Sequence, residues 1–315
     1  MVNASVARVS SGAALTGGGT ADGARPRVGL VVGAGGLKCA ASIGLWKVLR
    51  REGIPVDLLV GCSGGSLYTA CMALGYEADH IAELTARLWS TGLPRRLHYR
   101  SLLRAAFPRL FGRRRRIGLL DDSPFVRTVA EGIQNATFER LAVPLYLMAT
   151  DLETGQRVTL STGNVAEAVR ASVAIPVWFR PWVIDGRLLI DGGLSDPMPV
   201  SVAIREGCDV IIAMGFEQPG HDNFGSLLGL IGQVTAISMN NLLRSTFAFY
   251  NLAHHAEVVP IIPPFDRRVS LRDTHLLPYI IERGEAAAEA ELPYLRRLLG
   301  ARAAVAAAPA AEGSR

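Results

Sequence analysis

The chain of 315 residues is 49% hydrophobic and 19% charged, which is enough apolar side chain for one large core or two small ones, and we favour one large domain. Its net charge of +5 points to an anionic partner without locating it. No stretch reaches the roughly 18 uninterrupted apolar residues of a membrane span, and residues 1–25 lack the apolar core of a signal peptide, so neither a membrane-spanning protein nor export by the common route is expected.

The first predicted element is a buried strand at RVGLVVG, residues 27–33, where a β-branched run lies between polar residues. A glycine-rich loop follows, and apolar residues then recur at helical spacing until Gly53. A second strand is predicted at residues 56–60, and it runs into the turn GCSGG and a second helix toward Gly75. Strand, turn and helix thus alternate twice, which is typical of a parallel sheet covered by helices.

Three later strands are predicted at residues 144–151, 187–193 and 209–215. With the two earlier strand and helix pairs they predict an α/β fold, and we find no internal repeat. Residues 1–26 are predicted to be a flexible N-terminal tail, and the alanine-rich residues 300–315 a second tail at the other end.

The second turn has the sequence of a nucleophile elbow. Residues 61–65, GCSGG, fit the pattern G-x-S-x-G between a predicted strand and a predicted helix, which is the setting in which that pattern carries a nucleophile. A sharp turn holds the serine hydroxyl above the sheet, and Gly61 and Gly65 remove side chains that would clash with neighbouring backbone. Ser63 is therefore the candidate nucleophile, with an ordinary strand-to-helix turn as the alternative.

The first glycine loop has two interpretations. GAGGLK after a strand is reminiscent of a dinucleotide-binding loop, but Lys38 stands at the third glycine position, where a charged side chain would crowd the helix. In a parallel sheet the same loop can lie beside the strand that carries Ser63. The amides of Gly35 and Gly36 would then serve as an oxyanion hole, the set of donors that a tetrahedral intermediate needs.

The candidate base lies in IDGGLSDPMP, residues 190–199. Asp191 ends an apolar strand, and Gly192 and Gly193 leave its carboxylate open on one side. An aspartate that only satisfies its own turn is the competing interpretation.

Three ordered blocks resemble the patatin-like phospholipases, particularly their bacterial branch: the glycine loop at residues 29–49, the elbow at 55–67, and the segment at 148–200. The resemblance extends over about residues 27–299, which would form one hydrolase domain. It implies a three-layer α/β/α fold with a mostly parallel central sheet and a Ser-Asp dyad without histidine.

Carried over to this chain, the resemblance implies these site residues: catalytic Ser63 and Asp191, oxyanion-hole residues Gly35, Gly36 and Leu37, and motif glycines Gly61, Gly65, Gly192 and Gly193. The loop departs from the family pattern at its ends, because Ala34 and Cys39 stand where glycines are usual. Cys39 places a side chain where an unusual backbone angle is expected, so we expect strain in the backbone at this residue.

Other residues compete for catalytic roles. His254, His255 and His275 follow Asp191 in the order of an α/β-hydrolase triad, so an esterase with a catalytic histidine stays open as an alternative. A non-catalytic lipid-binding module that keeps the fold is a further alternative. Cys62, beside the serine, is expected to be a buried neighbour. The four cysteines show no CxxC pair and no metal-like spacing, so we expect reduced thiols in a cytoplasmic protein with no metal and no cofactor.

The segment at residues 93–116 is strongly basic, contains no acidic residue and is interleaved with large apolar side chains. Arg113, Arg114, Arg115 and Arg116 end it. Such a basic, lid-like insertion is typical of contact with a membrane surface, and a solvated loop is the equally open alternative. Together these features predict a phospholipase A or lysophospholipase that acts on lipid substrates, contacts the inner membrane surface peripherally and binds no nucleic acid.

Overall fold

The computed structural model describes residues 25–89, 118, 120–217, 226–252, 256–271 and 273–307, and for residues 227, 228, 251, 252 and 301–307 it describes the backbone alone. The basic segment at 93–116, and with it Arg113 to Arg116, lies outside the described residues, as do residues 1–24 of the predicted N-terminal tail. Among the described helices, none is both long and apolar enough to cross a bilayer.

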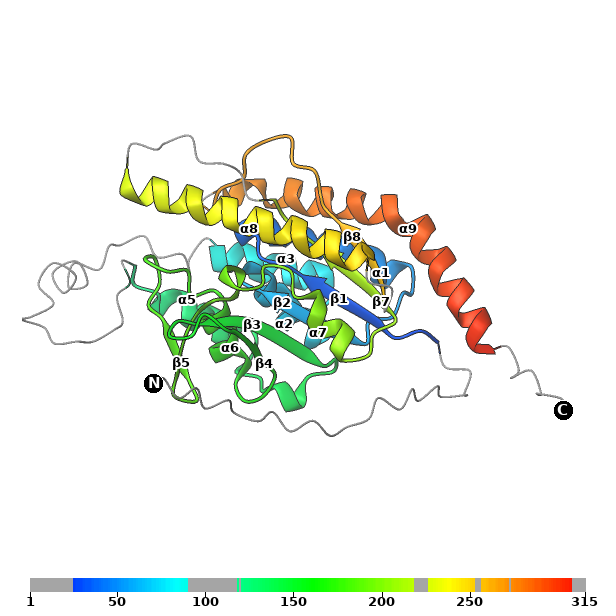
Figure 1. Cartoon of the computed structure of the whole chain (residues 1–315), viewed down its shortest axis with the longest axis horizontal. Coiled ribbons are helices and arrows are strands. Elements are labelled where there is room, and N and C mark those ends of the chain that lie inside the picture. Colours follow the sequence, from blue (N-terminus) through cyan, green and yellow to red (C-terminus); the bar gives the residue numbers. More distant parts are fainter. Residues whose placement is uncertain are drawn as a thin grey trace, which may run out of the picture.

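One sheet forms the centre of the molecule (Figure 1). Its strands in the described chain are β1 Val28–Val32, β2 Leu58–Cys62, β3 Leu145–Asp151, β4 Arg157–Leu160, β5 Trp182–Ile184, β6 Arg187–Asp191, β7 Val210–Met214 and β8 Glu257–Ile261. The order across the sheet is β5-β6-β3-β2-β1-β7-β8, with β4 also paired to β3. The five neighbouring strands β3, β2, β1, β7 and β8 are parallel, whereas β4, β5 and β6 pair in antiparallel fashion. The sheet is therefore mostly parallel, as predicted.

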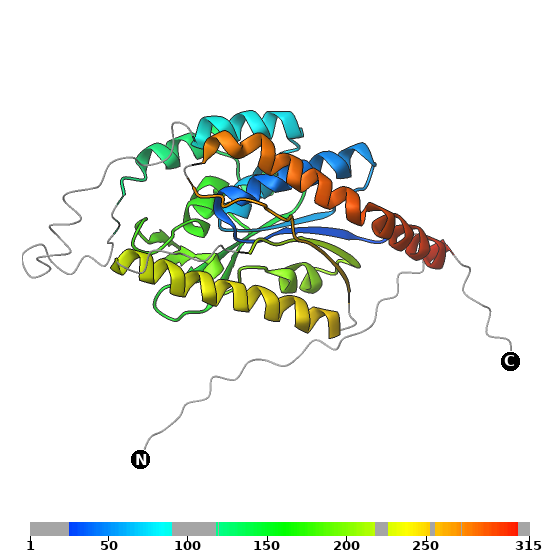
Figure 2. The same cartoon turned by 90° about the horizontal axis from the view of Figure 1, so that it is seen from above.

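Helices cover both faces of this sheet. The α-helices described are α1 Ala41–Arg51, α2 Gly64–Ala73, α3 Ala78–Arg87, α5 Ser123–Gly132, α6 Val165–Ser172, α7 Val200–Arg205, α8 Leu227–Leu252 and α9 Leu277–Ala307. Short 3₁₀ turns are η1 Gly36–Ala40, η3 Phe138–Arg140, η4 Gly192–Leu194 and η5 Thr274–Leu276. Figure 2 shows α1, α3 and α9 on one face and α7 and α8 on the other, which gives the predicted three layers.

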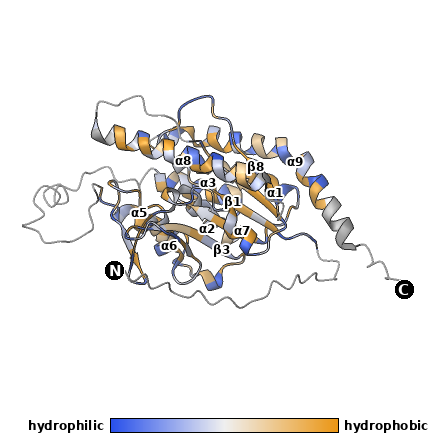
Figure 3. Cartoon of the chain, in the orientation of Figure 1, coloured by the Kyte–Doolittle hydropathy of each residue, from blue (hydrophilic) through white to orange (hydrophobic). Residues whose placement is uncertain are grey.

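The sheet separates two apolar cores. Alternate side chains of β1 illustrate the division, because Leu30 packs with the helices on the α1 and α2 side and Val31 packs on the α7 and α8 side. All five residues of β1 are buried. Strands covered on both faces are apolar throughout, which is why β1, β2 and β7 could be recognised as unbroken apolar runs and why strands are mostly coloured hydrophobic in Figure 3.

The largest differences between the element boundaries and the sequence predictions are at β2, at the end of β6 and at the end of α9. β2 lies two residues later than predicted, and the strand predicted to reach residue 193 ends at Asp191, because η4 turns the chain there. α9 continues to Ala307, so the chain is still helical where the C-terminal tail was predicted to begin at residue 300. Alanine, leucine and arginine favour helix, so the helix does not stop at Gly300.

Candidate active site

Ser63 forms the sharp turn between β2 and α2. Its φ of 51° and ψ of −124° are sparsely populated by residues other than glycine, as expected for a nucleophile elbow. The turn is held from two sides: the Ser63 amide donates to the Ser172 hydroxyl over 2.9 Å, and the Ser66 amide donates to the Ser63 carbonyl over 2.9 Å. These bonds fix the direction in which the Ser63 side chain projects.

The motif glycines allow this turn to pack against backbone. A Cβ atom added at Gly61 would lie 2.2 Å from the Thr69 hydroxyl oxygen, and one added at Gly65 would lie 2.3 Å from the carbonyl oxygen of Val32, at the end of β1. Both distances are far below any normal contact. Glycine at these positions therefore lets α2 start directly beside the ends of β1 and β2.

Asp191 lies beside Ser63. The Ser63 hydroxyl donates to Oδ2 of Asp191 over 2.6 Å, and the Gly193 amide donates to Oδ1 over 2.8 Å. Strand register explains the contact, because Cys62 of β2 is opposite Met148 of β3 and the next residue of β3, Ala149, is opposite Asp191 of β6. The sheet thus brings together two residues that are far apart in the sequence.

Burial controls the charge of Asp191. Its side chain is buried, and this burial raises the pKa of the carboxyl to about 6, although the hydrogen bonds from the Ser63 hydroxyl and the Gly193 amide oppose the rise. The carboxylate is therefore more basic than an exposed aspartate and is still ionised at neutral pH. A base of this kind, in hydrogen-bond contact with a hydroxyl, can accept its proton.

The glycine loop packs against the elbow. Gly36 has a φ of +59°, and a Cβ atom at Gly64 would lie 2.5 Å from the Gly36 carbonyl oxygen, so the two backbones touch directly after Ser63. The loop that carries the amides of Gly35, Gly36 and Leu37 therefore lies directly against the nucleophile turn.

The cysteine that departs from the family pattern, Cys39, fits into this loop without strain. Cys39 is absent from the residues with positive φ; it is buried in η1, and its thiol donates to the Gly33 carbonyl over 3.3 Å. The expected unusual angle at Cys39 is therefore wrong. Lys38 is also buried, and its ammonium group donates to the Glu217 carbonyl over 2.7 Å. Both side chains thus hold the loop by hydrogen bonds to backbone carbonyls.

Sequence reasoning missed Ser172. It is fully buried at the end of α6 and accepts the hydrogen bond from the Ser63 amide, while the nearby Ala174 carbonyl accepts one from the Asp191 amide over 3.0 Å. One short segment thus contacts the backbone of both Ser63 and Asp191. The only signal in the sequence was its place in the long third block of the family resemblance.

The competing candidates lie elsewhere. His275 is exposed in η5, and His254 and His255 are outside the described residues. Cys62 is buried and donates to the Asp196 carbonyl, and burial raises the pKa of its thiol well above the usual value, so a reactive thiolate is disfavoured. In the described part of the chain, no three His, Cys, Asp or Glu side chains gather so that they could hold a metal ion.

Comparison with known proteins identifies relatives. A family model described as patatin-like phospholipase matches residues 30–204. An uncharacterized NTE family protein of Mycobacterium tuberculosis is 31% identical over 228 residues, which cover 72% of this chain and 59% of that protein. The neuropathy target esterase sws of Drosophila melanogaster is 30% identical over 191 residues, which cover 59% of this chain and 13% of that protein.

The chain therefore spans less than two thirds of the length of either relative. Among solved structures, VipD from Legionella pneumophila aligns over 88% of this chain and 67% of its own, with a TM-score of 0.43 and 13% sequence identity. The matched family region, residues 30–204, contains the glycine loop, the elbow and Asp191.

Proposed function

Because the chain belongs to the patatin-like phospholipase family, we propose that it is a serine acyl hydrolase that cleaves carboxylic ester bonds of lipids, as a phospholipase A or a lysophospholipase. The observation that carries this proposal is the 2.6 Å hydrogen bond from the Ser63 hydroxyl to the buried Asp191 carboxylate, directly beside the glycine loop. Peripheral membrane contact through residues 93–116 stays a prediction.

In the proposed reaction, Asp191 takes the proton of Ser63 as the serine oxygen attacks the ester carbonyl carbon. The tetrahedral intermediate then collapses, the alcohol leaves with the proton held by Asp191, and the acyl group stays on Ser63. A water molecule next loses its proton to Asp191 and attacks the acyl carbonyl. The second tetrahedral intermediate that forms then collapses, which releases the fatty acid and returns the proton from Asp191 to Ser63, so the enzyme is restored.

The glycine loop has an electrostatic role in this scheme. Negative charge develops on the carbonyl oxygen in both tetrahedral intermediates, and amides that already point at this position stabilise it without reorganisation. Gly36 lies against Gly64, the residue after the nucleophile, and Leu37 follows it. We therefore assign the oxyanion hole to the amides of Gly35, Gly36 and Leu37.

Lipid hydrolysis tests this proposal directly. The purified protein is incubated with vesicles of a diacyl phospholipid, with a lysophospholipid, and with a soluble short-chain ester, and free fatty acid is measured for each. We expect release from the soluble ester and from at least one of the lipids. Absence of release from every ester would favour a non-catalytic lipid-binding module instead.

Substitution of Gly36 by valine is expected to lower kcat on a soluble ester by about a hundredfold, the scale of a damaged oxyanion hole. The φ of +59° at Gly36 disfavours any β-branched residue, so the amides would be displaced. Gly53→Val is the matched control: Gly53 has a similar φ of +62°, ends α1 away from the site, and has nothing within 4 Å of an added Cβ. The control should lose stability and keep its kcat. A raised KM with unchanged kcat in Gly36→Val would argue against the oxyanion role.

The pH dependence should report the pKa of Asp191. Because the base must be ionised, kcat/KM for an uncharged soluble ester is expected to fall as the pH drops through about 6 and to be flat a unit or more above that value. The measurement is a pH profile of initial rates between pH 4.5 and 9, bounds that we choose to bracket the transition. A profile without this acidic limb would contradict the assignment of Asp191 as the base.

A further inference from the structure

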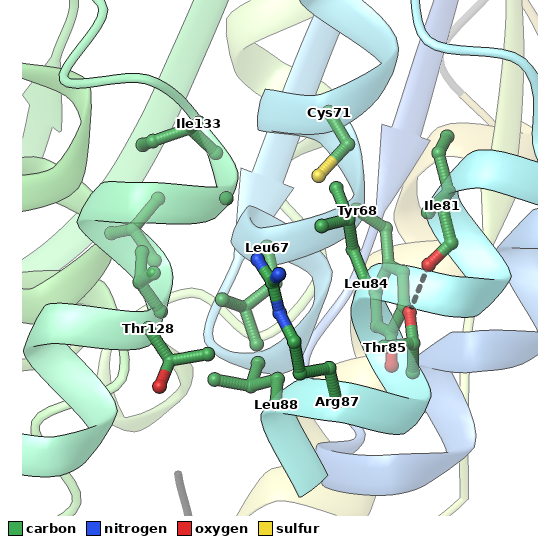
Figure 4. Close-up of a pocket in the computed structure, with 13 residues that line it drawn as sticks. Leu67, Tyr68, Cys71, Ile81, Leu84, Thr85, Arg87, Leu88, Thr128 and Ile133 are labelled. Carbon is green, nitrogen blue, oxygen red and sulfur yellow. Dashed lines mark hydrogen bonds between the residues drawn. The ribbon is translucent and has the colours of Figure 1, made fainter. Parts of the chain in front are cut away.

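A cavity lies beside the helix that starts at Ser63. It is enclosed by α2, α3 and α5, with Val169 of α6 completing the wall, and its free space is about 470 Å³ when the part open to solvent is counted (Figure 4). Its lining is predominantly apolar and includes Leu67, Cys71, Ile81, Leu88, Val129 and Ile133. Nothing in the proposed chemistry uses these side chains.

Two elements that hold the nucleophile also contribute residues to the cavity lining. Leu67 follows Ser63 by four residues, so it lies one helical turn further along α2. Val169 precedes Ser172 by three residues on α6, and Ser172 accepts the hydrogen bond from the Ser63 amide. Leu67 is thus one turn from Ser63 on α2, and Val169 is about one turn from Ser172 on α6.

We propose that this cavity binds the acyl chain of the ester, an inference that rests on the proposed hydrolase function. A mainly apolar space beside the helix that begins at a serine nucleophile suits a hydrocarbon chain, because each methylene that leaves water is stabilised. The carbonyl carbon would lie at Ser63, and the chain would run along α2 past Leu67 toward Cys71.

The length of α2 sets the length of chain that fits. Figure 4 shows Leu67 and Leu88 toward one end of the cavity and Cys71 and Ile133 at the other. Cys71 follows Ser63 by eight residues, so it is about 12 Å further along the helix axis. An extended alkyl chain gains roughly 1.3 Å per carbon, because its bonds of about 1.5 Å follow a zigzag. A chain attached at Ser63 would thus reach Cys71, at the far end of the cavity, with roughly its ninth carbon, and the rest of a longer chain would stay outside.

Gly132→Leu tests this assignment. Gly132 lines the cavity at the end of α5, and a Cβ atom added there would meet only Leu84, at an ordinary 3.8 Å, so a side chain can grow into the cavity without displacing backbone. We measure kcat/KM for p-nitrophenyl esters from butyrate to palmitate. In the wild type the value should rise up to about the decanoate. In Gly132→Leu the decanoate-to-butyrate ratio should fall at least tenfold, because each methylene kept out of the cavity forfeits about fourfold.

Three further variants separate a blocked cavity from a damaged fold. Gly132→Ala adds one methyl group and should shift the ratio only slightly. Cys71→Ala enlarges the far end and should move the preferred length to longer chains, whereas Cys208→Ala, a buried cysteine in the core on the other face of the sheet, should leave the length profile unchanged. Thermal unfolding of each variant confirms that it folds.

The outcomes distinguish this inference from the proposed function. If the wild type hydrolyses no ester of any length, the hydrolase proposal itself fails. If the wild type hydrolyses esters and folded Gly132→Leu and Cys71→Ala both keep its length profile, the acyl-chain assignment of this cavity is overturned while the hydrolase proposal stands.

Discussion

Ser63→Ala is expected to lower ester hydrolysis on the order of 10⁴-fold or more, because it removes the atom that attacks the carbonyl. The fold should persist, since alanine keeps the backbone bonds from the Ser63 amide to Ser172 and from the Ser66 amide to the Ser63 carbonyl. The measurement is kcat/KM on a soluble ester, with thermal unfolding in parallel. Ser42→Ala is the matched control, because Ser42 is also a buried serine and its hydroxyl donates to the Cys39 carbonyl instead of a carboxylate.

The control variant should hydrolyse the ester at a rate close to that of the wild type. Activity of folded Ser63→Ala near the wild-type level would end the serine hydrolase assignment, since no neighbouring group could replace the hydroxyl. The nearby Cys62 thiol is buried and has a raised pKa, so it cannot take over this role.

Asp191→Asn is expected to cost roughly three orders of magnitude or more in kcat, because an amide cannot accept the Ser63 proton. The fold should not suffer. Burial raises the pKa of Asp191 from 3.8 to about 6, so the folded protein binds this proton more tightly than the unfolded chain does. The wild type therefore loses stability as the pH rises through about 6 and the buried carboxylate becomes charged. An asparagine carries no charge at any pH. The variant's melting temperature at pH 8 should therefore equal or exceed that of the wild type.

The histidine variants complete this test. His254→Ala, His255→Ala and His275→Ala should each keep most activity, and the exposed position of His275 in η5 agrees with this for the one histidine of the three that the structure describes. A loss in one of these variants as large as that in Asp191→Asn would instead support a catalytic triad that includes histidine.

The sequence predicted the parts of this site that follow local rules. β1, β2 and β7 are apolar runs because both faces of the sheet are covered, and the Ser63 turn follows from the glycines that its close backbone contacts require. The relative positions of the site residues were harder to predict than their identities. The contact between Ser63 and Asp191 depends on the register of β2, β3 and β6, which no local pattern specifies.

Residues that act through tertiary contacts were missed for the same reason. Ser172 is one small polar residue in a helix, and only the docking of α6 against the elbow brings its hydroxyl to the Ser63 amide. Cys39 shows the converse case, because the pattern suggested a strained position and the structure places it in an ordinary 3₁₀ turn. The cavity beside α2 combines residues from four helices, so no single stretch of sequence reveals it.

Labelling with a fluorophosphonate tests whether Ser63 is an activated nucleophile, because the reagent reacts covalently with a serine whose hydroxyl is activated by a base in a functional site. The labelled protein is digested and the modified peptide is sequenced by mass spectrometry. We expect one adduct per chain, on Ser63, which is absent from Ser63→Ala and strongly reduced in Asp191→Asn. Unlabelled Ser63 in a folded protein, or an adduct that forms equally well in Asp191→Asn, would contradict this expectation.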